Sequence, residues 1–305
     1  MEELEKLGIK MEEFEKQISS FSNVSKGNRI KVSIYFLEEP TFNGTACKYA
    51  ILYLNSQQYT FEFQFPENES HLDSYSITDD QKKFAESLKE TEFNFNNAPS
   101  FFRFQNFLYE NNFAENAVIH VGIIDKPIDG NLFFESWINM IIITAHKWDK
   151  LFSPPSVFEY IIHCLNASIV QLATSIDSHD ETRGCVVDYT RFKEDDKVDI
   201  TLGYICDDCS SKIKEKSGEE FLQTIKIIAS HNWIGSVDKP DSLAYNLKKY
   251  YKVDIEKDSG FNKSYWEKAK EHFPELPLEI LKTIINPIVT VIVTLGILYL
   301  TGSLK

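Results

Sequence analysis

The residues whose types and spacing suggest chemistry are one histidine and three cysteines in the middle of the chain. His179 and Cys185 precede Cys206 and Cys209, which form a C-x-x-C pair. Such a pair presents two thiolates from one tight turn, the usual half of a tetrahedral zinc site, and His179 and Cys185 are the nearest candidates for the other half. Sulfur and imidazole ligands favour Zn²⁺ over Mg²⁺ or Ca²⁺. We therefore expect a fully ligated, structural zinc site.

A redox pair is the alternative for the two cysteines of the C-x-x-C motif. No thioredoxin-like βαβ pattern surrounds them, and Asp207 and Asp208 should raise the thiol pKa values rather than lower them. The other cysteines, Cys47 and Cys164, fit no ligand spacing, and we expect them to be small buried residues. The charged N-terminus lacks signal-peptide character, which favours a reducing cytoplasm over structural disulfides.

The elements that must position these ligands are predicted from the spacing of apolar residues. Three β-rich runs predict an antiparallel meander at 30–38, 47–55 and 59–65. Buried strands are expected at 117–124 and 137–144, followed by a long apolar helix at 156–176. Shorter helices are expected at 3–20, 79–91, 100–111, 219–231, 241–252 and 262–273. The fold class that follows is α+β.

The order of elements and ligands resembles the archaemetzincins, a branch of the zincin metalloproteases. That family carries HExxHxxGxxHC, then a Cys, a Met two residues later and a distant CxxC; the helix histidines hold a catalytic zinc and four cysteines hold a second zinc. On this chain the third histidine of the motif falls on His179 and the next cysteine on Cys185, and the C-x-x-C pair arrives one residue later than in the family. The helix at 156–176 and the Ile-rich strand at 140–143 occupy the places of the zincin active-site helix and edge strand. The resemblance implies a zincin-like mixed sheet with a long central helix.

The departures from the family motif fall on its catalytic positions. The two ligands and the general base of HExxH are replaced by Ile169, Val170 and Ala173. The family's glycine, the cysteine after the third histidine and the methionine are replaced by Ile176, Asp180 and Val187. A zinc hydrolase needs three protein ligands, an open position for water and a carboxylate base. The resemblance therefore implies a domain that has kept its structural zinc, lost its catalytic zinc and is not an enzyme.

A different alignment of the family's ligand motif on the long helix would place potential ligands there. Glu159 and His163 lie four residues apart on one helix face, as a remnant of a ligand motif would. No third ligand follows at a usable spacing, so we expect His163 to be a core histidine. A metalloprotease with a non-standard site stays open as an alternative.

Two further groups of charged residues lie around the metal ligands. Arg183 is a candidate for binding an anionic ligand, or for bridging a neighbouring carboxylate such as Asp188. Asp195, Asp196 and Asp199 predict a solvated acidic loop.

The C-terminal segment differs in kind from the rest of the chain. Between Lys282 and Lys305 the only ionisable side chain is that of Tyr299, and a stretch of this length spans a bilayer. We expect one transmembrane helix at 281–303, which anchors the chain by its tail and leaves residues 1–280 in the cytoplasm. A polar stripe along this helix comprises Thr283, Asn286, Pro287, Thr290, Thr294 and Thr301. Such side chains seek partners on neighbouring helices, which favours a homo-oligomer, with a water-lined pore as the bolder alternative.

The net charge of the chain narrows the classes of partner that it can bind. The 46 acidic and 32 basic residues give a net charge of −14, which opposes binding to nucleic acid.

We expect an N-terminal β-rich part with flanking helices (1–116), a zincin-like zinc-binding part (117–216), a helical connector (217–280) and the membrane helix; whether 30–116 is a separate domain stays open. The favoured function is a tail-anchored sensor or adaptor for a protein or small-molecule ligand. The alternative is a ligand-triggered, oligomerising membrane effector of a bacterial antiviral defence system.

Overall fold

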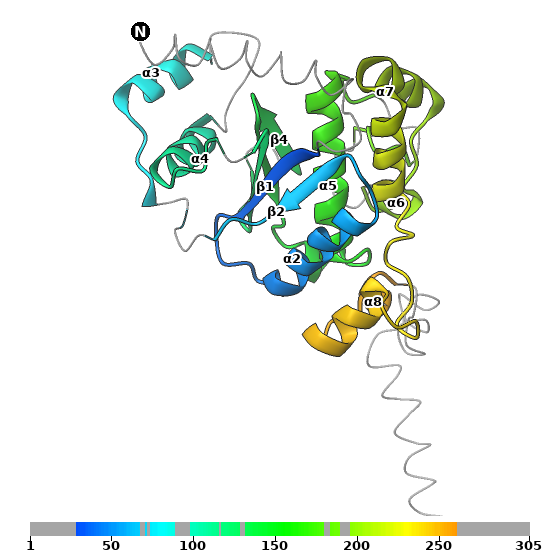
Figure 1. The fold of residues 1–305 in the computed structure, drawn as a ribbon. Helices are drawn as coiled ribbons and strands as arrows, with labels where there is room; N and C mark the ends of the chain where they lie inside the picture. The colour runs from blue at the N-terminus through cyan, green and yellow to red at the C-terminus, as the bar shows by residue number, and fades with distance from the viewer. Residues whose placement is uncertain are drawn as a thin grey trace, which may run out of the picture. The chain divides into compact units, whose positions relative to one another are not determined.

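A five-stranded mixed sheet lies at the centre of the computed structural model, which describes residues 29–67, 71, 74–88, 98–115, 117–128, 132–179, 184–189 and 196–260 (Figure 1). The strands are β1 (Ile30–Phe36), β2 (Phe61–Gln64), β3 (Ile119–Ile124), β4 (Phe134–Trp137) and β5 (Met140–Thr144). Their order is β2-β1-β3-β5-β4, and all neighbours are parallel except β4 and β5. The expected mixed sheet is confirmed, and it joins strands from both of the parts expected at 1–116 and 117–216.

The segment 47–55, expected as the middle strand of a meander, lies instead in helix α2 (Gly44–Tyr53) and the 3₁₀ turn that follows it (Leu54–Ser56), so that prediction is wrong. The Asn43 side chain caps α2 by accepting a hydrogen bond from the Ala46 amide at 3.0 Å. The buried residues of α2 follow the spacing of a helix rather than of a strand: Ala46, Cys47, Ala50 and Ile51. Because a helix connects β1 to β2, these two strands are parallel, not antiparallel as expected.

The segment 137–144, expected as one strand, contains the end of β4, a tight turn and β5. Ile138 adopts a left-handed φ of 56° in this turn, which reverses the chain and makes the two strands antiparallel. β5 pairs with β3 on its other side. The Ile-rich strand at 140–143 is therefore an inner strand, and the expectation that it forms the sheet edge is wrong; β4 is the edge strand.

The two faces of the sheet are both buried, because alternate residues of each inner strand enter two different cores. In β5, Ile141 and Ile143 pack with helices α2 and α5, whereas Met140 and Ile142 pack with helix α4 on the opposite face. The same alternation holds in β1 and β3. Continuous apolar runs of this kind are typical of parallel strands that are covered on both sides.

Helices α3 (Asp79–Leu88) and α4 (Ala98–Glu110) match the helices expected at 79–91 and 100–111. Phe104 and Phe107 of α4 make edge-to-face contacts with Tyr35 of β1, with ring centroids 5.8 and 5.3 Å apart. Gly122 of β3 leaves room for the Leu37 side chain, because a Cβ atom there would lie 2.4 Å from Leu37 and 3.4 Å from Phe104 of α4. This second core is separate from the layer that carries the candidate site.

Helix α5 (Val157–Thr174) confirms the long helix expected at 156–176. It begins with a capping box, in which the side chains of Ser156 and Glu159 each accept a hydrogen bond from the backbone amide of the other residue. Among the described residues, α5 is long and apolar enough to cross a membrane, but most of it is buried between the sheet and helix α7. It is therefore the core helix of this fold, and its length and composition are weak grounds for a membrane span.

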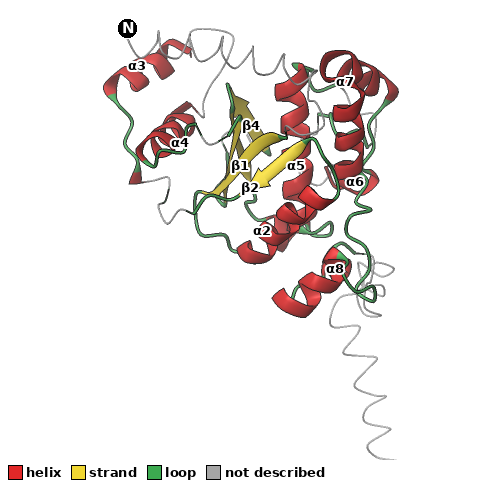
Figure 2. Ribbon diagram, viewed as in Figure 1, coloured by secondary structure: helices red, strands yellow, loops and turns green. Residues whose placement is uncertain are grey.

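Helices α6 (Asp196–Leu202) and α7 (Asp207–Ala229) contact α5 (Figure 2). They are followed by α8 (Leu243–Asn246), a π-helical turn at Leu247–Tyr251 that contacts α2, and α9 (Ile255–Asp258). The helix expected at 219–231 is the second half of α7, which bends at Gly218, where φ is 86°. The helix expected at 241–252 is α8 followed by the π-helical turn. The segments expected at 3–20, 262–273 and 281–303 lie outside the described residues.

Candidate metal centre

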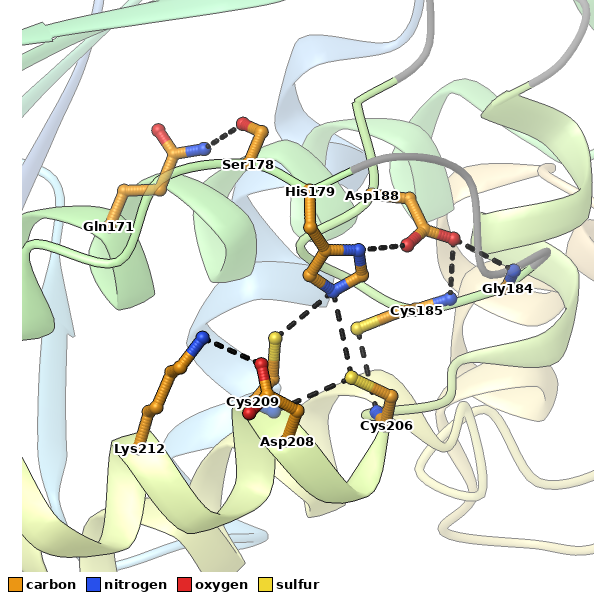
Figure 3. Close-up of polar contacts among 10 residues, drawn as sticks. All are labelled: Gln171, Ser178, His179, Gly184, Cys185, Asp188, Cys206, Asp208, Cys209 and Lys212. Atoms are coloured by element: carbon orange, nitrogen blue, oxygen red, sulfur yellow. Dashed lines mark hydrogen bonds and ion pairs between the residues drawn. The ribbon is translucent and has the colours of Figure 1, made fainter.

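The four expected metal ligands converge on one point (Figure 3). The Nε2 atom of His179 and the Sγ atoms of Cys185, Cys206 and Cys209 all lie within 4.8 Å of one another. His179 Nε2 is 3.1 Å from Cys209 Sγ and 3.6 Å from Cys206 Sγ. Cys185 and Cys209 are completely buried, whereas Cys206 is partly exposed. This group could hold a metal ion, and it is the set of residues that the sequence predicted.

The start of α7 supplies two of the thiols. Cys206 is the N-cap residue of this helix, and its sulfur lies 3.4 Å from the backbone amide of Cys209 in the first turn. The amides and the positive end of the helix dipole favour a negatively charged thiolate at this position. The C-x-x-C spacing thus has a local cause, since it places both sulfur atoms at the same helix end.

A loop held by backbone hydrogen bonds supplies the third thiol. Cys185 forms a β-bridge with Tyr204, in which Val186 donates to the Tyr204 carbonyl at 2.8 Å and Tyr204 donates to the Gly184 carbonyl at 3.2 Å. Gly184 adopts a φ of 130°, and a Cβ atom there would lie 2.5 Å from the Leu202 side chain. The loop therefore needs glycine at this position to bring Cys185 beside Cys206.

Asp188 is the residue of the site whose role the sequence interpretation missed. Its completely buried carboxylate lies 3.0 Å from His179 Nδ1, and its other oxygen accepts hydrogen bonds from the amides of Gly184 and Cys185 at 3.1 and 3.0 Å. Asp188 thus turns His179 so that Nε2 faces the thiols, and it ties the histidine to the cysteine loop. A carboxylate close in sequence to a candidate histidine ligand was the available signal. Arg183, expected to bind an anionic ligand or to bridge a carboxylate such as Asp188, lies outside the described residues.

The three thiols have different electrostatic surroundings. Burial raises the pKa of Cys185 to about 11. Burial, followed by the nearby Cys185, also raises the pKa of Cys209. Burial acts to raise the pKa of Cys206 too, but hydrogen bonds from the Cys209 amide and from neighbouring side chains lower it overall. The pKa of Cys206 is therefore lowered, not raised as expected from its position beside Asp207 and Asp208, because the hydrogen bonds at the helix end outweigh burial.

The positions that would hold a catalytic metal in the zincin motif contain no ligand. Ile169, Val170 and Ala173 are buried in the apolar core. In the part of the chain that the structure describes, the single group of three or more potential ligand atoms close enough to share a metal ion is the one around His179. The described residues therefore offer one metal position, and all its candidate ligands come from the segment 179–209.

The alternative pair on α5 serves a different purpose. The Glu159 carboxylate accepts hydrogen bonds from the Ser156 amide at 2.8 Å and from the hydroxyls of Ser156 and Ser259, and it faces His231 Nδ1 at 3.2 Å. His163 is buried, as expected, and its Nε2 lies 3.7 Å from an Asp196 oxygen. Glu159 and His163 thus contact different partners, and the two do not converge on a shared metal position.

The expected acidic loop is largely a helix. Asp196 and Asp199 begin α6 and are each only 3% exposed. The expectation of a solvated acidic loop is therefore wrong for these two residues, because they face the interior beside α5, where His163 contacts Asp196. Asp195 lies outside the described residues.

The buried positions of Cys47 and Cys164 confirm that they are core residues rather than ligands.

No protein-family model, no curated protein and no solved structure matches the chain. The class of protein that fold and site define is thus an α/β protein with a mixed sheet and a site of one histidine and three cysteines that could hold a metal ion.

Proposed function

We propose that the chain is a membrane-tethered, non-enzymatic sensor or adaptor whose zincin-like cytoplasmic domain is held together by a structural zinc ion. The observation that carries the proposal is the enclosure of one point by His179, Cys185, Cys206 and Cys209. Tetrahedral zinc with ordinary Zn–S and Zn–N bonds places its ligand atoms about 3.5–3.8 Å apart. The separations of His179 Nε2 from the Cys206 and Cys209 sulfurs, 3.6 and 3.1 Å, lie close to that range. Small shifts of the side chains would complete the site.

The ligand set supports a structural role rather than catalysis. Four protein ligands fill a tetrahedral zinc ion and leave no position for a reactive water, which a zinc hydrolase requires. The carboxylate of Asp188 contacts Nδ1 of His179, not the nitrogen that faces the thiols, and so is not placed to act as a base. The buried Ile169, Val170 and Ala173 provide no second metal site on α5.

The topology is compatible with the zincin-like assignment. The long helix α5 follows β5, whose neighbour β4 is an antiparallel edge strand, and the metal ligands come after this helix in the chain. This is the order of sheet, central helix and distal cysteine site on which the resemblance to the archaemetzincins rests.

The metal content of the purified full-length chain tests the structural role. We expect one zinc ion per chain by elemental analysis, lost in Cys206→Ser and retained in Cys47→Ser, because Cys47 is a buried cysteine outside the site. Should Cys206→Ser fail to fold, X-ray absorption of the wild-type protein still decides: the expected shell is one nitrogen and three sulfurs. Two metals per chain, or an oxygen in the metal shell, would overturn the proposal in favour of a metalloprotease with a non-standard site.

The membrane tether is tested by extraction with alkaline carbonate. We expect the full chain to stay with the membrane pellet and a version that ends at residue 280 to be released, because the charge-free stretch between Lys282 and Lys305 is then absent. Release of both versions would refute the tether. Dye leakage from cells that express the full chain, but not from cells that express the shortened one, would favour the membrane-effector function over the sensor function.

A further inference from the structure

Cys206 differs from the other cysteines of the chain in its access to solvent. All five cysteines lie in the described part of the chain, and among them Cys206 alone is partly exposed. Cys185 and Cys209, its neighbours in the candidate metal centre, are completely buried. A small molecule that approaches the centre from solvent therefore reaches the thiol of Cys206 first.

The position of Cys206 also suits a reactive sulfur. Cys206 is the N-cap of α7, and its Sγ atom lies 3.4 Å from the Cys209 amide. The first amides of a helix and the positive end of its dipole favour a negatively charged sulfur, and the thiolate is the form of cysteine that reacts as a nucleophile. A thiol that ligates zinc is already deprotonated, so the bound state keeps this form.

A second sulfur lies close enough to react with an oxidised Cys206. The Sγ atoms of Cys185, Cys206 and Cys209 lie within 4.8 Å of one another. Cys209 belongs to the same first turn of α7 as Cys206, whereas Cys185 comes from a loop that its β-bridge to Tyr204 holds in place (Figure 3). A bond between Cys206 and Cys209 therefore requires side-chain rotation within one helix turn and no movement of that loop.

We propose that Cys206 and Cys209 form a peroxide-sensitive pair, whose oxidation to a disulfide releases the zinc ion. The Cys206 thiolate attacks one oxygen of hydrogen peroxide; the O–O bond breaks, one water leaves and Cys206 becomes a sulfenic acid. The Cys209 thiolate then attacks the Cys206 sulfur, and the remaining oxygen leaves as a second water. The two thiolates lose two electrons, and the peroxide takes up these electrons together with two protons from solvent.

The disulfide removes two of the four candidate ligands. Its sulfur atoms carry no charge, so only His179 and Cys185 remain to hold the metal. The metal-mediated connection between the loop at 184–188 and the start of α7 is then lost, and thiol reductants can restore it. The inference rests on the proposed function, because it needs the structural zinc ion. It gives the proposed sensor a signal of defined chemistry, which is a peroxide.

The experiment treats the purified full-length chain, first shown by elemental analysis to contain zinc, with hydrogen peroxide. A coloured chelator follows zinc release, and mass spectrometry of peptides digested without reduction maps the disulfides. We expect zinc release to be at least about tenfold faster than without peroxide, together with a link between Cys206 and Cys209. Dimedone, which traps sulfenic acids, should label Cys206 and not Cys209. Dithiothreitol and added zinc should restore the original metal content.

Cys164→Ser is the matched control, because Cys164 is a buried cysteine outside the site. This variant should release zinc in peroxide at the wild-type rate, and Cys47 should stay unmodified in both proteins. The metal content before treatment separates the two proposals. A chain purified without zinc refutes the structural site, whereas a chain that holds zinc and keeps it in peroxide, or loses it without the link between Cys206 and Cys209, overturns the peroxide-sensitive pair alone.

Discussion

The Nδ1 atom of His179 lies 3.0 Å from a carboxylate oxygen of Asp188, whose side chain is completely buried. This contact fixes the ring so that Nε2, the other nitrogen, faces the thiols of Cys206 and Cys209. A histidine ligand of a metal is usually held in this way by a second partner, which sets the tautomer and raises the basicity of the ligating nitrogen. Asp188 is therefore as much a part of the site as the four ligands.

Replacing Asp188 by asparagine should weaken metal binding by about 10–100-fold. The amide keeps the size of the side chain but loses the charge that supports the imidazole. Competition with a colorimetric zinc chelator measures the affinity. Asp208→Asn is the matched control, since Asp208 lies beside the site but is exposed and pairs with Lys212 at 2.6 Å. Equal affinity of the Asp188→Asn variant and the wild type would contradict the role of Asp188.

Removing the metal should destabilise the domain. The site joins the loop at 184–188 to the start of α7. Because the metal binds the folded chain and not the unfolded one, its binding stabilises the folded state. A loss of about 3 kcal/mol would lower the Tm by roughly 6–12 °C for a domain of this size. Calorimetry with and without a chelator measures the shift. The chelator should not change the Tm of Cys206→Ser, because that variant has already lost a ligand.

The elements that could be predicted from the sequence are those in which one periodicity dominates. Helix α5 begins at a capping box formed by Ser156 and Glu159 and continues as a long, mostly apolar run, and β3 is a fully buried strand in which His120 is the one polar side chain. The candidate ligands Cys206 and Cys209 could be predicted because the C-x-x-C spacing reflects a single helix end. These features depend on neighbours in the sequence, and neighbours in the sequence are visible without a structure.

The features that could not be predicted depend on partners far along the chain. The segment at 47–55 mixes aromatic, apolar and polar residues in a composition that favours a strand, and only packing against α5 and the sheet shows that one face of a helix is buried. Asp196 and Asp199 have the charge of a surface loop, yet α6 turns them inward beside His163. The parallel order of β1 and β2 follows from α2 being a helix, so one wrong element changed the predicted topology.

Replacing Glu159 by glutamine should destabilise the protein by about 2–4 kcal/mol, because a buried carboxylate that accepts several hydrogen bonds loses its charge beside His231. Urea unfolding measures the difference. Glu219→Gln is the control, since Glu219 is exposed and its pair with Lys214 lies on the surface; its free energy of unfolding should be nearly unchanged. A Glu159→Gln variant as stable as the wild type would contradict the role of this carboxylate.

The same residue contributes a dependence on pH. Burial acts to raise the pKa of Glu159, but the hydrogen bond and the charge of His231 and the bonds from Ser156 and Ser259 lower it overall. Because the folded pKa lies below the unfolded value, the stabilisation is present above the unfolded pKa of 4.5 and is lost as the pH falls through the folded pKa. Glu159→Gln should remove this part of the acid sensitivity.

His163 should make the stability of the domain depend on pH in a higher range than Glu159 does. Burial, and then the positive charge of His231, lower the pKa of His163 from 6.5 to about 3, so the ring is neutral at pH 7 and its contact with Asp196 is not an ion pair. Below pH 6.5 the unfolded chain binds a proton that the folded chain excludes. Stability should therefore fall by up to about 1.4 kcal/mol per pH unit as the pH drops from 6.5 towards 3. Urea unfolding at pH 7.0 and 5.5 should differ by about 1.3 kcal/mol from this residue alone. In His163→Gln that part should vanish, whereas His71→Gln, a change at an exposed histidine, should keep it. An unchanged pH slope in His163→Gln would show that the buried ring takes up its proton without unfolding, and that α5 tolerates a charge beside Asp196.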